Sequence, residues 1–500
     1  MPIAWAAAPA AAAIAFTSIA VPVSAPSLDV VPAHPAIAAH GWAAFVAQDG
    51  KKRCEVSLWH VESGRAVSAY RAPCEHGDVF YNVIPGPDGD TPELVALDGE
   101  GVVRVFPEPR ARVIRQPSFP VVAPAVRAPG PDLWLAHESA GAPLTLAIPS
   151  LTDISLWQRD APGAAEAAPV PAPAADGAER WHRGDVFHVA VDAEYDPRIG
   201  RDSLSPDFSV LAHLRMPKWA LGQIDASGTP GLLYALENEV TGTHAENGTA
   251  PPKALFHAEK VLFADDPNGN DPRLVRGNRL ADIDGDGQLD VALVAARGGI
   301  THLETAMEVW FGPLAESLNH DPDMSLRGTG AAVGTELVDL VHDSRLSVLR
   351  PKVEVSIAAF VRILLFGEVH IDYQFFDVVR GEHGNQQPFC SFERPLPVDL
   401  EGLSAKAAPL FTTEGDFNGD GLADVLTGEG TKGYVILRGK RGDRGRWCAA
   451  ADEPQPIPVA KAEGLTVVDL DGDGRSDLIA IHAADHGDST VTLLLSTHTP

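Results

Sequence analysis

The chain has 500 residues, 45% of them hydrophobic, and contains 46 glycines and 42 prolines. That is more helix-breaking residues than a protein built of long helices tolerates. This composition favours many short strands joined by tight turns, arranged either as about three domains or as one large β architecture. The formal net charge of −29 argues against binding to nucleic acid and to anionic membrane surfaces, because both would repel the chain.

The first 25 residues are apolar and rich in alanine, and they end in Val23-Ser24-Ala25, a small-x-small pattern typical of signal-peptide cleavage. The segment has no Lys or Arg and contains three prolines, so the alternatives are a disordered Ala/Pro leader and a misassigned start. We predict a secretory signal over residues 1–25 and an extracytoplasmic location, whether periplasmic, cell-surface or secreted. No later stretch reaches 18 uncharged apolar residues, so the mature chain is expected to have no transmembrane span.

The four cysteines form no CxxC motif, which argues against a zinc ribbon or a thioredoxin-like site. An even number of cysteines in an exported chain allows two disulfides. Cys54–Cys74 with Cys390–Cys448 is the most local of the three possible pairings, and four buried free thiols are the alternative.

Three nine-residue segments follow the pattern Asp-x-Asp-x-Asp-Gly-x-x-Asp, with Asn418 as the one replacement. They span 282–290, 416–424 and 469–477, and each lies between a short apolar stretch and a β-type run. Weaker copies occupy 339–347 and 223–231, and eroded copies lie near Gly41, Asp88 and Pro129. The ninth motif positions then fall at 42, 93, 132, 231, 290, 347, 424 and 477.

Most spacings between these copies match a four-stranded propeller blade or slightly exceed it. The two widest spacings contain an Ala/Pro-rich insertion at 161–177 and the apolar stretch 353–366, either a buried helix or a pair of long strands. We therefore predict an all-β fold, a single β-propeller over 26–500. It has eight candidate blades, with seven as the alternative, and a short apolar insertion near 350–368. The last copy supplies only three strands, and we predict that Leu28–Val31 adds the fourth and closes the ring.

Carboxylates at positions one, three, five and nine of a tight turn repel one another unless a cation neutralises them. Glycine at position six permits the positive φ that folds the turn toward one point. Ca²⁺ accepts six to eight oxygen ligands in loose geometry, whereas Mg²⁺ is stricter, and the carbonyl of position seven offers one more oxygen. An EF-hand does not fit, because position twelve is never Glu. A metal-free hairpin turn is the alternative.

The three loops resemble the FG-GAP (VCBS-type) repeats of integrin-α-like β-propellers. This resemblance implies three Ca²⁺ sites, each in a hairpin between two strands of a blade. The implied ligands, with the position-seven residue acting through its carbonyl, are Asp282, Asp284, Asp286, Gln288 and Asp290; Asp416, Asn418, Asp420, Leu422 and Asp424; and Asp469, Asp471, Asp473, Arg475 and Asp477. The copies at 339–347 and 223–231 lack several of these ligands, so we predict that they bind no metal.

The sequence contains no GxSxG, HExxH, P-loop or strand-linked GxGxxG motif, so no catalytic residue is predicted. We expect an exported calcium-binding propeller that serves as a binding or adhesion scaffold for a protein or a glycan. The alternative is an extracytoplasmic hydrolase or lyase with its site in the propeller channel, because propellers host both classes of function. A purely structural subunit of a surface assembly is a third interpretation.

Overall fold

The computed structural model describes most of residues 14–498. Gaps of ten or more residues lie at 1–13, 116–144, 160–180, 196–211, 261–273, 354–367 and 398–410. The described residues include two helices of four residues each, α1 (Pro35–Ala38) and α2 (Leu314–Ser317), and the regular structure is otherwise strand. No helix in the described part of the chain is long and apolar enough to cross a membrane.

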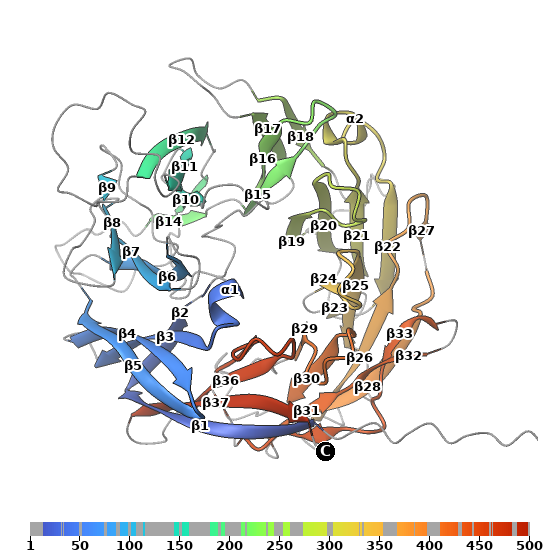
Figure 1. The fold of residues 1–500 in the computed structure, drawn as a ribbon. Helices are drawn as coiled ribbons and strands as arrows, with labels where there is room; N and C mark the ends of the chain where they lie inside the picture. The colour runs from blue at the N-terminus through green and yellow to red at the C-terminus, as the bar shows by residue number, and fades with distance from the viewer. Residues whose placement is uncertain are drawn as a thin grey trace, which may run out of the picture.

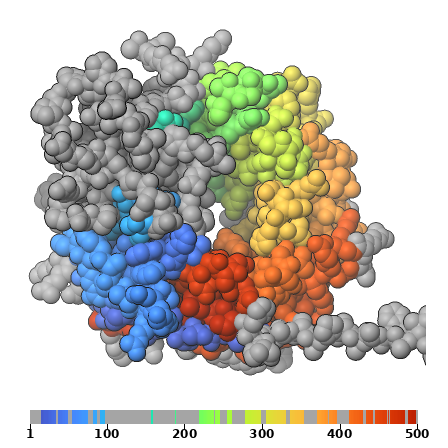
Figure 2. Space-filling view, viewed as in Figure 1, coloured from blue at the N-terminus to red at the C-terminus, as the bar shows by residue number. Residues whose placement is uncertain are grey.

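The chain is a β-propeller. Its described residues form eight sheets of three to five strands, which follow one another around a ring in chain order (Figure 1). In the space-filling view the coloured parts of the sheets border a central hollow below it and to its right (Figure 2). Neighbouring strands are antiparallel throughout these sheets, except for one short parallel pair, β22 with β27.

The first four sheets contain between three and four described strands each. The first is β2 (Ser27–Val31), β3 (Trp42–Asp49), β4 (Arg53–Glu62) and β5 (Arg65–Pro73); the second is β6 (Asp78–Pro85), β7 (Pro92–Asp98), β8 (Val102–Phe106) and β9 (Ile114–Arg115); the third is β10 (Thr145–Pro149), β11 (Asp153–Arg159) and β12 (Trp181–His188); the fourth is β15 (Lys218–Gln223), β16 (Pro230–Leu236), β17 (Glu239–His244) and β18 (Phe256–Glu259). A separate pair, β13 (Asp192–Tyr195) with β14 (Ala212–Arg215), lies between the third and fourth sheets in sequence.

The last four sheets carry the acidic motifs. The fifth is β19 (Leu274–Ala281), β20 (Asp290–Arg297), β21 (Glu304–Trp310), β22 (Met324–Thr329) and β27 (His383–Gly384); the sixth is β23 (Ala331–Ala332), β24 (Glu336–Asp339), β25 (Leu346–Val353), β26 (Glu368–Phe376) and β28 (Cys390–Pro397); the seventh is β29 (Phe411–Gly415), β30 (Asp424–Gly428), β31 (Tyr434–Leu437) and β34 (Gln455–Pro456); the eighth is β35 (Gly464–Val468), β36 (Asp477–His482), β37 (Ser489–His498) and β1 (Ile14–Ala25). A separate hairpin joins β32 (Gly439–Arg441) to β33 (Trp447–Ala449).

The spacing of the motif copies predicts where second strands begin. Position nine of seven copies lies at the first residue of β3, β7, β16, β20, β25, β30 or β36, or one residue after it. The copy near 132 lies outside the described residues, and the middle strand of the third sheet begins at Asp153 instead. This agreement confirms the blade-sized repeat, because the motif copies fall at the same place, the start of the second strand, in seven of the eight sheets.

The ring closes through a different segment from the one predicted. Leu28–Val31 lies in β2, which pairs with β3 of the first sheet, so the prediction that it completes the last sheet is wrong. The fourth strand of the eighth sheet is β1, which pairs with β37 from Ile14↔His498 to Ala25↔Ser489 (Figure 1). Alternate residues of β1 are buried, including Ile19, Val21 and Val23, because one face of this strand packs in a hydrophobic cluster shared with the first sheet.

This strand lies within the segment predicted to be a secretory signal. Cleavage after Ala25 would remove β1 and leave the edge of β37 unpaired. The signal over residues 1–25 stays a prediction, and residues 1–13 lie outside the described part of the chain.

The two predicted insertions fall mostly outside the described residues. The Ala/Pro-rich stretch 161–177 is not described at all. Near 350–368 the described ends are strands: β25 pairs with β26 up to Val353↔Ile371, and residues 354–367 between them are not described. The choice between a buried helix and a pair of strands applies to 353–366, which lies outside the described residues except at Val353, and it stays a prediction.

The hydrophobic core lies between neighbouring sheets. Phe45 of the first sheet packs in one cluster with Leu493 of the eighth, and Phe375 of the sixth packs in another with Leu437 of the seventh. Both predicted disulfides are present. Cys54–Cys74, with its Cα atoms 5.2 Å apart, staples the first sheet, and Cys390–Cys448, at 5.5 Å, ties β28 to β33.

Candidate metal centres

The three acidic motifs occupy equivalent turns of three sheets. Loop 282–290 joins β19 to β20, loop 416–424 joins β29 to β30, and loop 469–477 joins β35 to β36. The degenerate copies 339–347 and 223–231 join the same pair of strands in the sixth and fourth sheets. The fourth to eighth sheets therefore carry a motif copy at the same place, in the loop that precedes the strand β16, β20, β25, β30 or β36.

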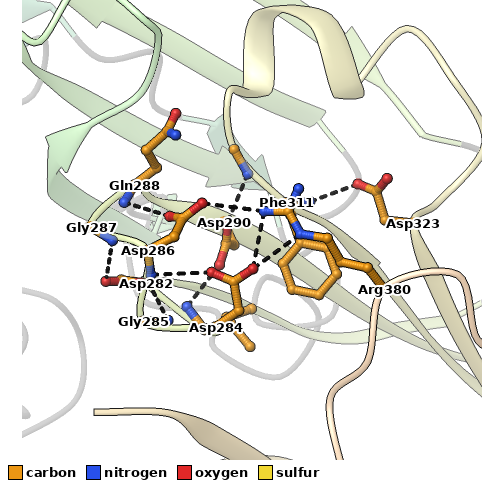
Figure 3. Close-up of polar contacts among 12 residues, drawn as sticks. Asp282, Asp284, Gly285, Asp286, Gly287, Gln288, Asp290, Phe311, Asp323 and Arg380 are labelled. Atoms are coloured by element: carbon orange, nitrogen blue, oxygen red, sulfur yellow. Dashed lines mark hydrogen bonds and ion pairs between the residues drawn. The ribbon is translucent and has the colours of Figure 1, made fainter.

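The position-one aspartate organises each acidic loop by accepting backbone N–H groups. In loop 282–290, Asp282 Oδ1 accepts from Gly285 N at 2.8 Å and Asp286 N at 3.1 Å, and Oδ2 accepts from Gly287 N at 2.9 Å (Figure 3). Asp416 and Asp469 make the corresponding contacts with the glycines at positions four and six of their loops.

Glycine at position six has a positive φ in all three loops, as predicted: 87° at Gly287, 78° at Gly421 and 82° at Gly474. Glycine at position four also has a positive φ, for example 79° at Gly285, although the motif leaves this position open. Two left-handed residues in one short turn are what let a single carboxylate reach several amides.

The position-nine aspartate is a buried anchor. Asp290, Asp424 and Asp477 are each 0% exposed. In each, Oδ2 accepts the N–H of position two of its own loop, and Oδ1 accepts an N–H from the far end of the blade's third strand or beyond it. For Asp477 these donors are Leu470 N at 2.7 Å and Ser496 N at 2.6 Å; Asp290 and Asp424 make the same pair of bonds.

Burial raises the pKa of each position-nine carboxyl to about 7, against the opposing effect of the two backbone hydrogen bonds. Neighbouring carboxylates of the same loop push these pKa values in the same direction as burial. A cation beside the carboxylates would favour their charged form and remove much of this penalty.

Two of the loops gather three carboxylates around one point. One oxygen from each of Asp282, Asp284 and Asp290 lies within 4.8 Å of the other two, and Asp469, Asp471 and Asp477 are arranged in the same way. Within the described residues these are the only groups of three such ligands this close together. Loop 416–424 is not among them, and it has one carboxylate fewer because Asn418 stands at position three.

The position-five aspartates, which the motif assigns as ligands, stand outside both clusters. Asp286 Oδ2 lies 3.2 Å from Arg380 Nη2, and Asp473 Oδ2 lies 3.8 Å from Arg475 Nη1. Their Oδ1 atoms accept the N–H of position seven, Gln288 and Arg475, at 2.9 Å. Leu422 donates its N–H to Asp420 in the same way. The three position-seven residues are thus held in the turn by their amides.

The degenerate copies keep features of the turn but lack several of its ligands. In loop 339–347, His342 and Ser344 adopt the positive φ values of 51° and 67° at positions four and six, and Asp339 Oδ2 still accepts Ser344 N at 3.2 Å. In loop 223–231, Asp225 bonds His244 Nε2 at 3.0 Å. That neither turn binds metal stays a prediction.

A chain of backbone hydrogen bonds links the five turns, and no residue pattern indicated it. In each loop after 223–231, the N–H of position eight donates to a carbonyl at position one or two of the preceding loop. The four bonds are Leu289 N to Gln223 O at 2.7 Å, Leu346 N to Ile283 O at 2.9 Å, Ala423 N to Leu340 O at 3.0 Å, and Ser476 N to Asp416 O at 2.8 Å. The turns therefore form one continuous belt.

The sequence matches a family model described as an FG-GAP-like repeat over residues 416–480, which contain two of the three acidic loops. No curated protein matches the chain. Similar solved structures include the WD40 domain of SCAP from fission yeast, with 10% identity, a TM-score of 0.39 and coverage of 96% of this chain and 98% of that chain.

Another is BBS1N in complex with ARL6DN, with 9% identity, a TM-score of 0.33 and coverage of 97% and 98%. A third is a protein from Lactobacillus plantarum, with 9% identity, a TM-score of 0.31 and coverage of 72% and 86%. Similarity at this level carries no functional argument. The FG-GAP-like match agrees with the predicted repeat, whereas a specific likeness to integrin α chains stays a prediction.

Proposed function

We propose that this protein is an exported propeller whose fold is stabilised by Ca²⁺ in loops 282–290, 416–424 and 469–477, and which serves as a binding scaffold for a protein or a glycan. The observation that carries the proposal is the convergence of three carboxylates on one point in each of two equivalent loops. The third loop has the same turn and the same buried position-nine anchor.

The donors fit a hard cation. Every side-chain ligand that the motif provides is a carboxylate or, at Asn418, an amide, and Ca²⁺ prefers such oxygens and tolerates irregular geometry. In each loop, the side chains at positions one, three and nine would hold the ion. The position-five carboxylate would join them if its side chain rotated toward the other three. The ion's contribution would be to neutralise crowded charge and thereby stabilise the turn.

The two disulfides support export. Structural disulfides persist in oxidising compartments and are rare where thiols are kept reduced. Cys54–Cys74 and Cys390–Cys448 account for all four cysteines of the chain. An extracytoplasmic compartment also supplies free calcium at the concentrations at which weak extracellular sites work, with Kd values of about 10⁻⁴–10⁻³ M.

The calcium role is tested by thermal unfolding of the full chain in CaCl₂ and in EGTA. Each site stabilises the folded state by about 2.7 kcal/mol when calcium is at 100 times its Kd, so the midpoint should rise by several degrees in CaCl₂. Asp284→Asn with Asp471→Asn should reduce the rise. Asp343→Asn in the degenerate loop 339–347 is the matched control and should leave it unchanged. A midpoint that is the same in CaCl₂ and EGTA would remove the calcium role.

The scaffold role is tested separately, by screening the calcium-loaded chain against protein and glycan libraries. We expect specific binding that weakens in EGTA, because the loops that calcium orders form one belt through their backbone hydrogen bonds. Cleavage of a polysaccharide by the purified chain would instead support a hydrolase or lyase.

A further inference from the structure

Arg380 reaches the first acidic loop from a neighbouring sheet. It lies in residues 377–384, here called the strap, which leave β26 of the sixth sheet and run along the outer edge of the fifth. Gly381 N donates to Asp323 O at 2.8 Å, and Ser325 N donates to Glu382 O at 3.0 Å. The strap ends in β27, the parallel fifth strand of that sheet. Arg380 is therefore held beside loop 282–290 by backbone hydrogen bonds.

The guanidinium contacts two of the carboxylates that the motif assigns to calcium. Arg380 Nε lies 3.1 Å from Asp284 Oδ2, and Nη2 lies 3.0 Å from the same atom and 3.2 Å from Asp286 Oδ2 (Figure 3). Its Cζ atom stands 4.6 Å from the centre of the Phe311 ring. Phe311 is itself fixed, because its N–H donates to Asp323 Oδ2 at 2.9 Å.

The other two acidic loops differ in this respect. In loop 469–477, Arg475 Nη1 lies 3.8 Å from Asp473 Oδ2, and its charge also acts on Asp471 without forming a second ion pair. In loop 416–424, Asn418 Nδ2 donates to Asp420 Oδ2 at 3.1 Å. Among the described residues, Arg380 is the one cation that bridges two carboxylates of an acidic loop.

We propose that Arg380 is an internal cation that competes with calcium for loop 282–290 and gives this loop a lower calcium affinity than loop 469–477. The proposal rests on the calcium function proposed above. Calcium needs the Asp284 carboxylate, which the Arg380 guanidinium already contacts. A bound calcium ion would also place its two positive charges close to the positive charge of Arg380. The loops would then fill in sequence as calcium rises, with loop 282–290 after loop 469–477.

The size of the effect follows from the exposure of the site. The Arg380 side chain is 49% exposed, so the repulsion between the two cations is screened as in water. At a separation of about 5 Å between calcium and the guanidinium, this repulsion and the loss of the ion pairs of Arg380 with Asp284 and Asp286 together correspond to roughly a tenfold change in the calcium Kd of loop 282–290. Because Phe311 and the strap keep the guanidinium near the loop, its repulsion persists after calcium binds.

The test is calorimetric calcium titration of the full chain, with Asp420→Asn and Asp471→Asn present to weaken the other two loops. Both changes keep the oxygen that accepts the amide of each turn. Arg380→Gln should lower the remaining Kd about tenfold, and Arg380→Met provides a second neutral side chain should the first variant fold poorly. Arg380→Lys, which keeps the charge, should stay within about twofold of the parent.

Arg71→Gln is the matched control. Arg71 is 44% exposed, lies 3.9 Å from Glu55 Oε1 and has its Cζ 4.7 Å from the Trp59 ring. It belongs to β5 of the first sheet, which carries neither the strap nor loop 282–290. It should leave the Kd unchanged, and higher salt should shrink the ratio between the parent and Arg380→Gln.

The outcomes separate the two proposals. If Arg380→Gln and Arg380→Met bind calcium as weakly as the parent, the competing role of Arg380 is wrong while the calcium function stands. If the chain without any substitution shows no calcium binding, both proposals are overturned.

Discussion

Replacing Asp477 with Ala tests the buried position-nine anchor. The change removes both acceptors of Leu470 N and Ser496 N, at 2.7 and 2.6 Å, in a position that is fully buried. Each buried amide left without a partner costs about 1–3 kcal/mol, so the free energy of unfolding should fall by about 2–6 kcal/mol even in EGTA. The same residue is a proposed calcium ligand, so the loss should be larger in CaCl₂.

Urea unfolding followed by tryptophan fluorescence measures this loss in both buffers. Asp473→Ala in the same loop is the control, because that side chain is exposed and its one backbone bond is to Arg475 N. It should cost less than about 1 kcal/mol in EGTA. If Asp477→Ala unfolds at the same urea concentration as the parent in EGTA, the position-nine carboxylate does not anchor the hairpin.

Three further results are expected. Burial raises the pKa of the position-nine carboxyls to about 7. In EGTA their contribution to the free energy of unfolding is therefore fully present below about pH 4 and is lost as the pH rises through 7. The thermal midpoint of a variant with all three position-nine aspartates changed to Asn should depend less on pH over this range. A chain that starts at residue 26 lacks β1 and should unfold earlier or associate through β37, seen by calorimetry and gel filtration, whereas one starting at residue 12 should not. Replacing Cys390 and Cys448 with Ser removes a cross-link over 58 residues and should cost about 4 kcal/mol in chemical unfolding.

The acidic repeat could be found in the sequence because the turn depends on side-chain identity. Aspartate at position one and glycine at position six are what the turn requires, as the contacts of Asp282 and the positive φ of Gly287 show. Spacing between the copies then indicated blade-sized units. The same turn survives in loop 339–347 with non-glycine residues at positive φ, which explains why this weaker copy still marks the start of β25.

The strand that closes the ring could not be predicted correctly from the sequence, because residues 14–25 fit two different patterns. Residues 14–25 are apolar enough for a signal peptide, and they also alternate as a half-buried strand. Length and composition do not separate these alternatives. Because residues 1–25 were assigned to a signal peptide, Leu28–Val31 was the candidate strand at the start of the mature chain; it is a strand, but in the first sheet.

The contacts that distinguish the acidic loops depend on tertiary structure. Arg380 lies 94 residues after Asp286, and no local spacing connects them. The belt of position-eight amides uses only backbone atoms, so it leaves no trace in residue identity. The surroundings of position five could not be predicted from the sequence either. The motif assigns Asp286 as a calcium ligand, whereas the fold places Arg380 beside its carboxylate.

The most direct test of the account is a crystal structure of the full chain grown in CaCl₂, with anomalous difference density used to locate the ions. We expect three peaks, one in each of the loops 282–290, 416–424 and 469–477, with carboxylate oxygens at about 2.3–2.6 Å from each ion. Loops 223–231 and 339–347 should show none. Density absent from all three acidic loops, with their carboxylates bonded only to backbone amides and arginines, would contradict the central claim.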